Sequence, residues 1–189
     1  ITVQEKIQDH SLKDQFIHVS EVKSIMTDIC QGLDDAHKVT LHLDLKPGNV
    51  FLTKGRRAKL LDFGLAKALH GSSNTTDYGV MGTPFFIAPE QLKAKPVKPT
   101  AATDIYALGA ILYQLITLEI PTPGMDSVAN LRKDVPEQLD DLVKRCLAPR
   151  AQSRPQTVSE FKDLFDSSFV KRTSRNKPLV VTRTFAPRN

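Results

Sequence analysis

The 189-residue sequence predicts an α+β domain that is mainly α-helical and carries one small β-hairpin. Three patterns support this class: apolar residues recur every three or four positions at 22–33, a nearly uncharged run fills 104–117, and two short β-prone runs lie at 50–53 and 59–61. At roughly 100 to 200 residues per domain, this length allows one domain, or one domain with a tail. We therefore do not expect a multidomain chain.

The helix at 22–33 has the clearest pattern, and Ser20 is its expected N-cap. Its apolar face is formed by Val22, Ile25, Met26, Ile29, Cys30 and Leu33. The run at 104–117 is apolar nearly all round, with Thr103 available as a cap, so we expect a helix that is buried on every side. It is too short and too interrupted to cross a bilayer.

Two further amphipathic helices are expected near the C-terminus. One covers 139–147, with Pro136 in its first turn, and the other follows Arg154 with an apolar face at 158–165. The segment 119–135 contains two prolines and a glycine, which predicts a loop with at most one short helix.

Polar clusters stand at both ends of the predicted hairpin. Residues 54–57 join the two β-prone runs as a turn, the segment 42–49 enters the hairpin, and 62–64 leaves it. Antiparallel pairing brings the start of one strand beside the end of the other. We therefore expect the two polar clusters to form one site.

The two clusters read HLDLKPGN and DFG. They resemble the catalytic loop (HRDLxxxN) and the metal-binding loop (DFG) of the eukaryotic-type, or Hanks-type, serine/threonine protein kinases. Downstream, Gly82-Thr83-Pro84 and Ala88-Pro89-Glu90 are similar to the end of the family's activation segment, which here covers 62–90. The sequences HLDLKPGN and IAPEQL are similar to the corresponding motifs of bacterial members.

The resemblance implies the C-terminal, larger lobe of the protein-kinase fold over 1–168, followed by a basic tail or linker at 169–189. The N-terminal lobe is expected to be absent from this chain, because the sequence contains no GxGxxG and no VAIK-type lysine. Residues 1–14 are similar to the strand, hinge and turn that join the two lobes. The alternative for 1–7 is a frayed terminal strand.

The resemblance also implies the roles of the polar residues. Asp44 would accept a hydrogen bond from the substrate hydroxyl and orient it, and Lys46 would contact the γ-phosphate of ATP. Asn49 and Asp62 would be oxygen ligands of Mg²⁺. Each of these roles requires the polar cluster to face a nucleotide.

Three residues are expected around the adenine base by the same resemblance. Glu5 and Ile7 would offer backbone groups to its edge, and Phe51 would lie under its face. ATP and Mg²⁺ are thus the cofactors that the sequence predicts.

Supporting residues follow from the same motifs. The resemblance pairs Glu90 with Arg154 in a buried ion pair, places Asp104 under the amides of the catalytic loop, and packs His42 against the phenylalanine of DFG. Thr83 would reach Asp44, and a lysine at position 46 together with this threonine is typical of the serine/threonine branch.

One position departs from the family pattern. Leu43 replaces the usual arginine, so the pocket for an activation-segment phosphate lacks its central cation. Candidate phosphosites remain at Ser72, Ser73, Thr75, Thr76 and Tyr78. We expect activity to depend weakly on their phosphorylation.

Charge and cysteines constrain the remaining functions. The formal charge of +5 arises in the tail, because 170–189 holds six bases and no acid, so a nucleic-acid-binding face on the folded part is not expected. The tail is either a solvated linker or a weak contact to phosphates or a membrane surface.

Cys30 and Cys146 lie in apolar helical patterns, which predicts buried reduced thiols and a reducing, cytoplasmic compartment.

The sequence thus predicts part of a serine/threonine protein kinase domain that transfers the γ-phosphate of ATP to a protein hydroxyl, with the missing small lobe as a required partner. One alternative is a pseudokinase or regulatory module that binds proteins through 78–135. Another is a nucleic-acid or membrane-surface binder that acts through the tail.

Overall fold

The computed structural model describes residues 1–63, 84–92 and 97–170. Its helices and strands, in chain order, are α1 (Val3–Leu12), α2 (Val19–His37), β1 (Val50–Leu52), β2 (Ala58–Leu60), α4 (Ala101–Thr117), α5 (Val128–Leu131), α6 (Gln138–Cys146) and α7 (Val158–Ser168). Short 3₁₀ turns are η1 (Pro47–Asn49), η3 (Pro84–Phe86), η4 (Pro89–Leu92) and η5 (Ala151–Ser153). The class is mainly helical with one small hairpin, as predicted.

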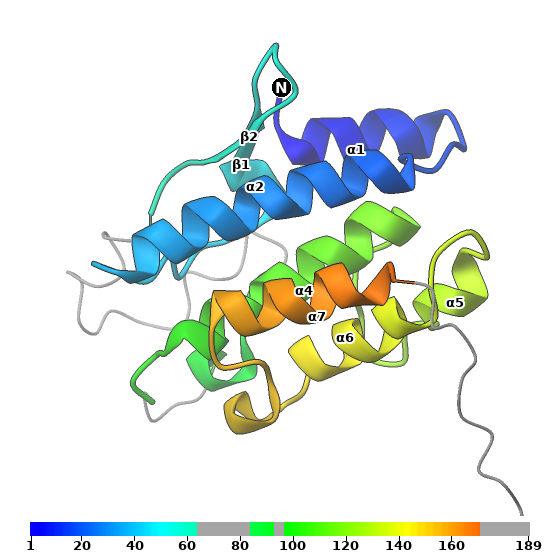
Figure 1. Ribbon diagram of the computed structural model, residues 1–189. Coiled ribbons are helices and arrows are strands. Elements are labelled where there is room, and N and C mark those ends of the chain that lie inside the picture. The colour runs from blue at the N-terminus through cyan, green and yellow to red at the C-terminus, as the bar shows by residue number, and fades with distance from the viewer. Residues whose placement is uncertain (64–83, 93–96, 171–189) are drawn as a thin grey trace, which may run out of the picture.

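Helix α4 lies at the centre of the core and contacts α2, α6 and α7 (Figure 1). All of its residues from Ala102 onward are buried except Tyr106, which confirms the prediction of a helix buried all round. The predicted cap was wrong by one turn, because the N-cap is Thr100. Thr103 lies inside the first turn, where its Oγ1 accepts a hydrogen bond from the Thr100 N–H at 3.1 Å.

Helix α2 separates the hairpin from α4 and α7 (Figure 1). Its predicted apolar face is buried in full, but the helix begins before the predicted cap Ser20. His18 is the N-cap, and its Nδ1 accepts a hydrogen bond from the Ser20 N–H at 3.3 Å. An imidazole nitrogen thus fills the position at which a hydroxyl oxygen was expected.

The predicted hairpin forms with β1 and β2 antiparallel, and Phe51 is paired with Lys59. Val50 and Ala58 point into the core, while Phe51 points outward. The start of the chain runs beside β1, because the Leu52 N–H donates to the Ile1 carbonyl at 2.7 Å. The hairpin therefore lies between the first residue of the chain, which bonds to β1, and α2, which packs against β2.

The extended hinge predicted for 1–14 was wrong, as was the alternative of a frayed strand at 1–7, because α1 is helical from Val3. The sequence signal is a capping box: the Glu5 N–H donates to Thr2 Oγ1 at 3.1 Å, and the Thr2 N–H donates to Glu5 Oε2 at 2.8 Å. Ile7 is 2% exposed and lies in the core. Since the Glu5 amide is bonded within the cap and Ile7 is buried, neither offers the extended backbone edge that was predicted to meet adenine.

The C-terminal helices follow the predicted apolar faces. Helix α6 has Glu137 as its N-cap, so Pro136 precedes the helix instead of lying in its first turn. Thr157 caps α7, accepting a hydrogen bond from the Glu160 N–H at 3.0 Å. The segment 119–135 holds only the short α5, as expected.

Glycine is required where α4 meets α6. A Cβ at Gly109 would overlap with the Cβ of Cys146, whereas a Cβ at Gly32, the matched glycine inside α2, would touch Leu60 at an ordinary 3.4 Å. We expect Gly109→Ala to lower the free energy of unfolding by about 1 to 3 kcal/mol through overpacking. Gly32→Ala should raise it by up to about 1 kcal/mol through helix propensity. Urea unfolding checks both; equal effects would contradict the close approach of the helices.

Both cysteines are buried free thiols, as predicted. Burial raises the pKa of Cys30 to about 12 and raises that of Cys146 as well. We expect iodoacetamide to label neither thiol in the folded chain at mildly alkaline pH, because the reactive thiolate is scarce and inaccessible. Mass spectrometry should find both labelled in concentrated urea; fast labelling without urea would contradict this burial.

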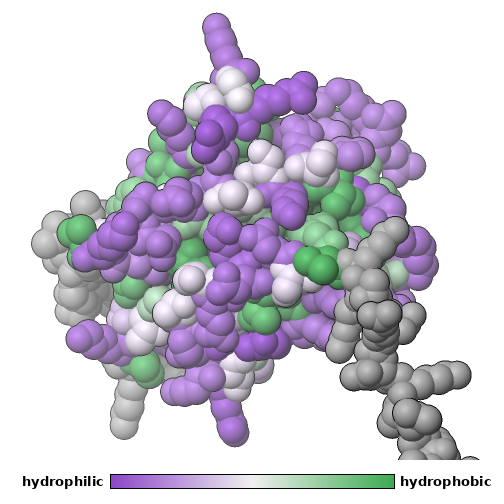
Figure 2. All heavy atoms as spheres, viewed as in Figure 1, coloured by the Kyte–Doolittle hydropathy of each residue, from purple (hydrophilic) through white to green (hydrophobic). Residues whose placement is uncertain are grey.

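The surface is mainly hydrophilic on the face shown in Figure 2, where apolar side chains appear only as small separate patches. In the part of the chain that the structure describes, no helix has the length and apolar character needed to cross a membrane.

Candidate active site

Asp104, at the start of α4, holds the backbone of the 42–49 loop. Its carboxylate, 1% exposed, accepts hydrogen bonds from the N–H groups of His42 and Leu43, both at 2.8 Å. Leu43 has a left-handed φ of 59°, a conformation that costs energy for a non-glycine residue. The expected contact of Asp104 with the loop amides is thus confirmed, and it fixes a strained turn immediately before Asp44.

Asp44, Lys46 and Asn49 form one polar cluster. The Lys46 ammonium lies 3.0 Å from Asp44 Oδ2, and Asn49 Nδ2 donates to the Asp44 carbonyl at 2.8 Å and to its Oδ2 at 3.0 Å. The side chains of Asp44 and Lys46 are 26% and 38% exposed. The cluster is therefore ordered by its own hydrogen bonds and still open to a reactant.

Asp62 follows β2 and comes close to Asn49, because the Leu61 N–H donates to the Asn49 carbonyl at 2.9 Å. Asp62 is exposed and has a left-handed φ of 52°. The hairpin thus brings the two predicted polar clusters together. The described residues contain no group of three or more His, Cys, Asp or Glu side chains suited to a metal. An amide and a carboxylate oxygen do suit Mg²⁺, since it takes few protein ligands and keeps several waters.

His42 contacts Phe63, as expected, with ring centroids 4.7 Å apart. Burial lowers the pKa of His42, against the opposing charge of Asp104, so the ring is neutral at neutral pH. Its Nδ1 accepts a hydrogen bond from the Asp44 N–H at 3.4 Å. The His42 ring therefore contacts both Phe63, which follows Asp62, and the backbone N–H of Asp44.

Glu90 and Arg154 form the expected ion pair, with two contacts of 2.8 Å. Thr103 donates to Glu90 at 3.1 Å, and Arg154 also donates to the Ala102 carbonyl at 2.9 Å. Burial acts to raise the pKa of Glu90, but the hydrogen bonds and charge of Arg154, with smaller contributions from its own backbone and Thr103, outweigh it and lower the pKa. The pair joins η4, α4 and the turn before α7.

Other predicted residues have different outcomes. Phe51 is 39% exposed on the outer side of β1, where a flat apolar group could lie against it. Thr83, the candidate phosphosites at 72–78 and the tail from 171 onward lie outside the described residues. His37, which no sequence motif indicated, has its Nε2 2.8 Å from Asp104 Oδ2. No local pattern indicated this contact, because the two residues are 67 positions apart in the chain.

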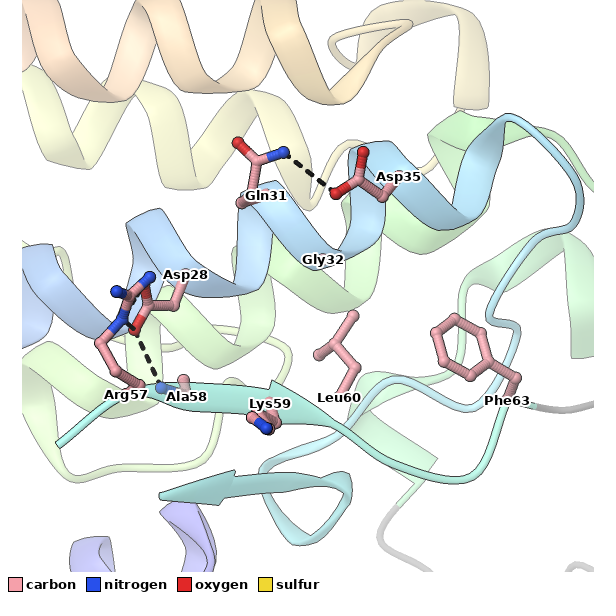
Figure 3. Close-up of a pocket in the computed structure, with 9 residues that line it drawn as sticks. All are labelled: Asp28, Gln31, Gly32, Asp35, Arg57, Ala58, Lys59, Leu60 and Phe63. Atoms are coloured by element: carbon pink, nitrogen blue, oxygen red, sulfur yellow. Dashed lines mark hydrogen bonds and ion pairs between the residues drawn. The ribbon is translucent and has the colours of Figure 1, made fainter. Parts of the chain in front are cut away.

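A pocket of about 360 Å³ lies between α2 and β2 (Figure 3). In Figure 3, Leu60 points toward α2 at Gly32, and Phe63 lies beside it. Arg57 closes the other end through its ion pair with Asp28, at 2.7 Å. None of the cluster residues Asp44, Lys46 and Asn49 lines this pocket.

Comparison with known proteins assigns the family. The family model described as protein kinase domain matches residues 2–175. The chain is 35% identical over 155 residues to serine/threonine-protein kinase PknB of Mycolicibacterium smegmatis, covering 73% of this chain and 24% of the relative. It is 31% identical over 186 residues to a probable serine/threonine-protein kinase of Clostridium acetobutylicum, covering 90% of this chain and 28% of the relative.

The fold agrees with a solved relative. The kinase domain of PknI from Mycobacterium tuberculosis superposes with a TM-score of 0.69 at 28% identity, covering 89% of this chain and 62% of that domain. Of the full length of the two serine/threonine-protein kinases named above, this chain spans about a quarter. The matched motifs, the helical architecture and this superposition agree: the chain belongs to the protein kinase domain family, and its relatives are bacterial Hanks-type serine/threonine kinases.

Proposed function

We propose that this chain is the catalytic lobe of a serine/threonine protein kinase. Its family uses ATP with Mg²⁺ and phosphorylates protein hydroxyls. The observation that carries the proposal is the cluster of Asp44, Lys46 and Asn49, with the Asp62 segment hydrogen-bonded beside it. The cluster orders its own loop and still leaves the side chains of Asp44 and Lys46 open to a reactant.

The cluster supplies the positions that phosphoryl transfer needs. Asp44 accepts the hydrogen bond of a substrate hydroxyl and orients its oxygen for in-line attack. Lys46, held at 3.0 Å from Asp44, stabilises negative charge on the transferred phosphoryl group. Before a substrate binds, this ion pair also keeps the side chains of Asp44 and Lys46 next to each other in the loop.

Asn49 and Asp62 are the residues that would hold Mg²⁺. When bound, the ion neutralises charge on the phosphates of ATP. The amide hydrogens of Asn49 point to Asp44 at 2.8 and 3.0 Å, and this fixes the orientation of its side chain. Phe51, outward on β1, would lie against the adenine base of the nucleotide.

The proposal is tested by joining the small lobe of M. smegmatis PknB to Ile1 and assaying transfer of labelled phosphate to peptide mixtures. The fusion should label serine and threonine peptides in a Mg²⁺-dependent reaction and leave tyrosine peptides unlabelled. Asp62→Asn should remove most of this activity and raise the Mg²⁺ concentration required. Nucleotide binding without any transfer would reject the proposal in favour of a pseudokinase.

A further inference from the structure

We infer that the turn of the β1–β2 hairpin is a docking site for an acidic protein segment, that is, an extended stretch of a partner chain that carries several carboxylates. Residues 50–61 contain no acid, and within them stands a group of exposed bases, the basic hairpin patch, formed by Lys54, Arg56, Arg57 and Lys59. Binding at this patch does not require phosphoryl transfer, so the inference goes beyond the proposed function.

The basic hairpin patch differs from the helix surfaces in the partners of its bases. Lysines on the helices pair with a carboxylate one turn away at 2.7 Å, as in Lys13–Asp9, Lys38–Asp35, Lys144–Asp140 and Lys162–Asp166. Among the residues that the structure describes, Lys54, Arg56 and Lys59 form no ion pair. Neighbouring cations repel one another, and approaching carboxylates relieve this repulsion.

Arg56 occupies a backbone position that favours glycine. Its φ of 59° is left-handed, and its N–H closes the turn by donating to the Thr53 carbonyl at 2.9 Å. A residue with a Cβ costs energy in this conformation, and hairpin turns commonly place glycine there. In this chain the glycine stands one residue earlier, at Gly55. An arginine that is kept at such a cost indicates a use for its side chain.

Arg57 fixes the patch against α2. Its Nε lies 2.9 Å from each carboxylate oxygen of Asp28, and the Ala58 N–H donates to the same carboxylate at 2.9 Å (Figure 3). The Arg57 side chain is nevertheless 71% exposed, whereas that of Asp28 is 8% exposed. Because the turn is already held in place, binding of a partner has to order little of this protein.

The size of the patch favours a peptide over a nucleic acid. Proteins that bind duplex DNA through its charge contact roughly six to ten phosphates, more than these few bases can reach. Guanidinium groups, by contrast, form paired hydrogen bonds with single carboxylates. A segment with three or four carboxylates therefore matches the charge of the patch.

The test is fluorescence anisotropy of the 189-residue chain with a labelled ten-residue peptide that contains four consecutive glutamates. The parent protein should bind it about tenfold or more tightly at low salt than the same peptide with glutamines, and added salt should weaken binding. Changing Lys54, Arg56 and Lys59 together to glutamine should raise Kd for the glutamate peptide about tenfold.

The matched control removes the same charge from the tail by changing Arg172, Arg175 and Lys177 to glutamine, and it should change Kd by less than about twofold. Equal losses in the hairpin and tail variants would overturn the inference, as would equal binding of the two peptides by the parent. The inference would also fail if the hairpin variant lost more affinity for single-stranded DNA or phosphatidylserine vesicles than for the glutamate peptide.

Arg56→Gly separates docking from folding. It should raise Kd for the glutamate peptide about threefold and also raise the urea concentration at the midpoint of unfolding, because glycine relieves the strained turn. A variant that unfolds at lower urea than the parent would overturn the inference, since the fold itself would then explain the arginine.

Discussion

Asp44→Asn should lower kcat of the small-lobe fusion to near background, a loss of roughly 100- to 10,000-fold. Asparagine keeps the size of the side chain, and its oxygen can still accept the hydrogen bond from Asn49. Its neutral amide, however, lacks the negative charge with which a carboxylate accepts the hydrogen bond of the substrate hydroxyl. The contact with Lys46 also loses its charge. The measurement is the steady-state rate of transfer of labelled phosphate to a threonine peptide at saturating ATP and peptide.

Asp35→Asn is the matched control for this change. Asp35 is an exposed carboxylate of α2 that pairs with Lys38 at 2.7 Å, so it carries the same chemical change outside the cluster. Its kcat should stay within about twofold of the parent protein, since surface pairs contribute little. Equal rates for Asp44→Asn and the parent would remove Asp44 from the role assigned to it.

Arg154→Met should lower the free energy of unfolding by about 3 to 5 kcal/mol. The Arg154 side chain is fully buried and that of Glu90 is 8% exposed, so the variant leaves an uncompensated carboxylate inside the protein. Adding Glu90→Met should recover part of the loss, because an apolar pair replaces the isolated charge. Urea unfolding of the 189-residue chain measures both variants.

Arg145→Met provides the comparison, because Arg145 pairs with Glu160 at the surface, where the side chains are 47% and 43% exposed. It should cost less than about 1 kcal/mol. A loss as large as that of Arg154→Met would show that burial is not the cause.

Acid should distinguish the parent protein from Arg154→Met. In the parent, the pKa of Glu90 is lowered from its ordinary 4.5, so its contribution is present above about pH 4.5 and is lost as the pH falls through the folded pKa. In Arg154→Met, burial without Arg154 raises that pKa, and protonation relieves the buried charge. The difference in unfolding free energy between the two proteins should therefore begin to narrow above pH 4.5, as Glu90 of the variant takes up its proton. It should narrow further below pH 4.5, as the parent loses the contribution of its ionised Glu90.

The sequence predicted those elements whose pattern is local. The apolar face of α2, the full burial of α4 and the hairpin follow from periodicity, and the contacts of Glu90 with Arg154 and of His42 with Phe63 follow from motifs at matching positions. These contacts join residues far apart in the chain, so periodicity alone could not have found them.

The failures lie at the starts of helices. The resemblance to the family suggested a strand and hinge for the first residues, but the Thr2–Glu5 capping box starts a helix at Val3. The caps of α2 and α4 were misplaced because a serine and a threonine inside the first turn resemble N-caps in sequence. His37 was missed because its partner Asp104 is 67 residues away.

The burial of α4 also bears on synthesis of the chain. Its covering helices come from both sides of the sequence: α2 precedes it, and α6 and α7 follow it. While the ribosome is still translating α7, this nearly uncharged helix has no complete shelter from water or from other nascent chains. We therefore expect the lobe to fold late, in one cooperative step, and to need chaperone protection until α7 has emerged.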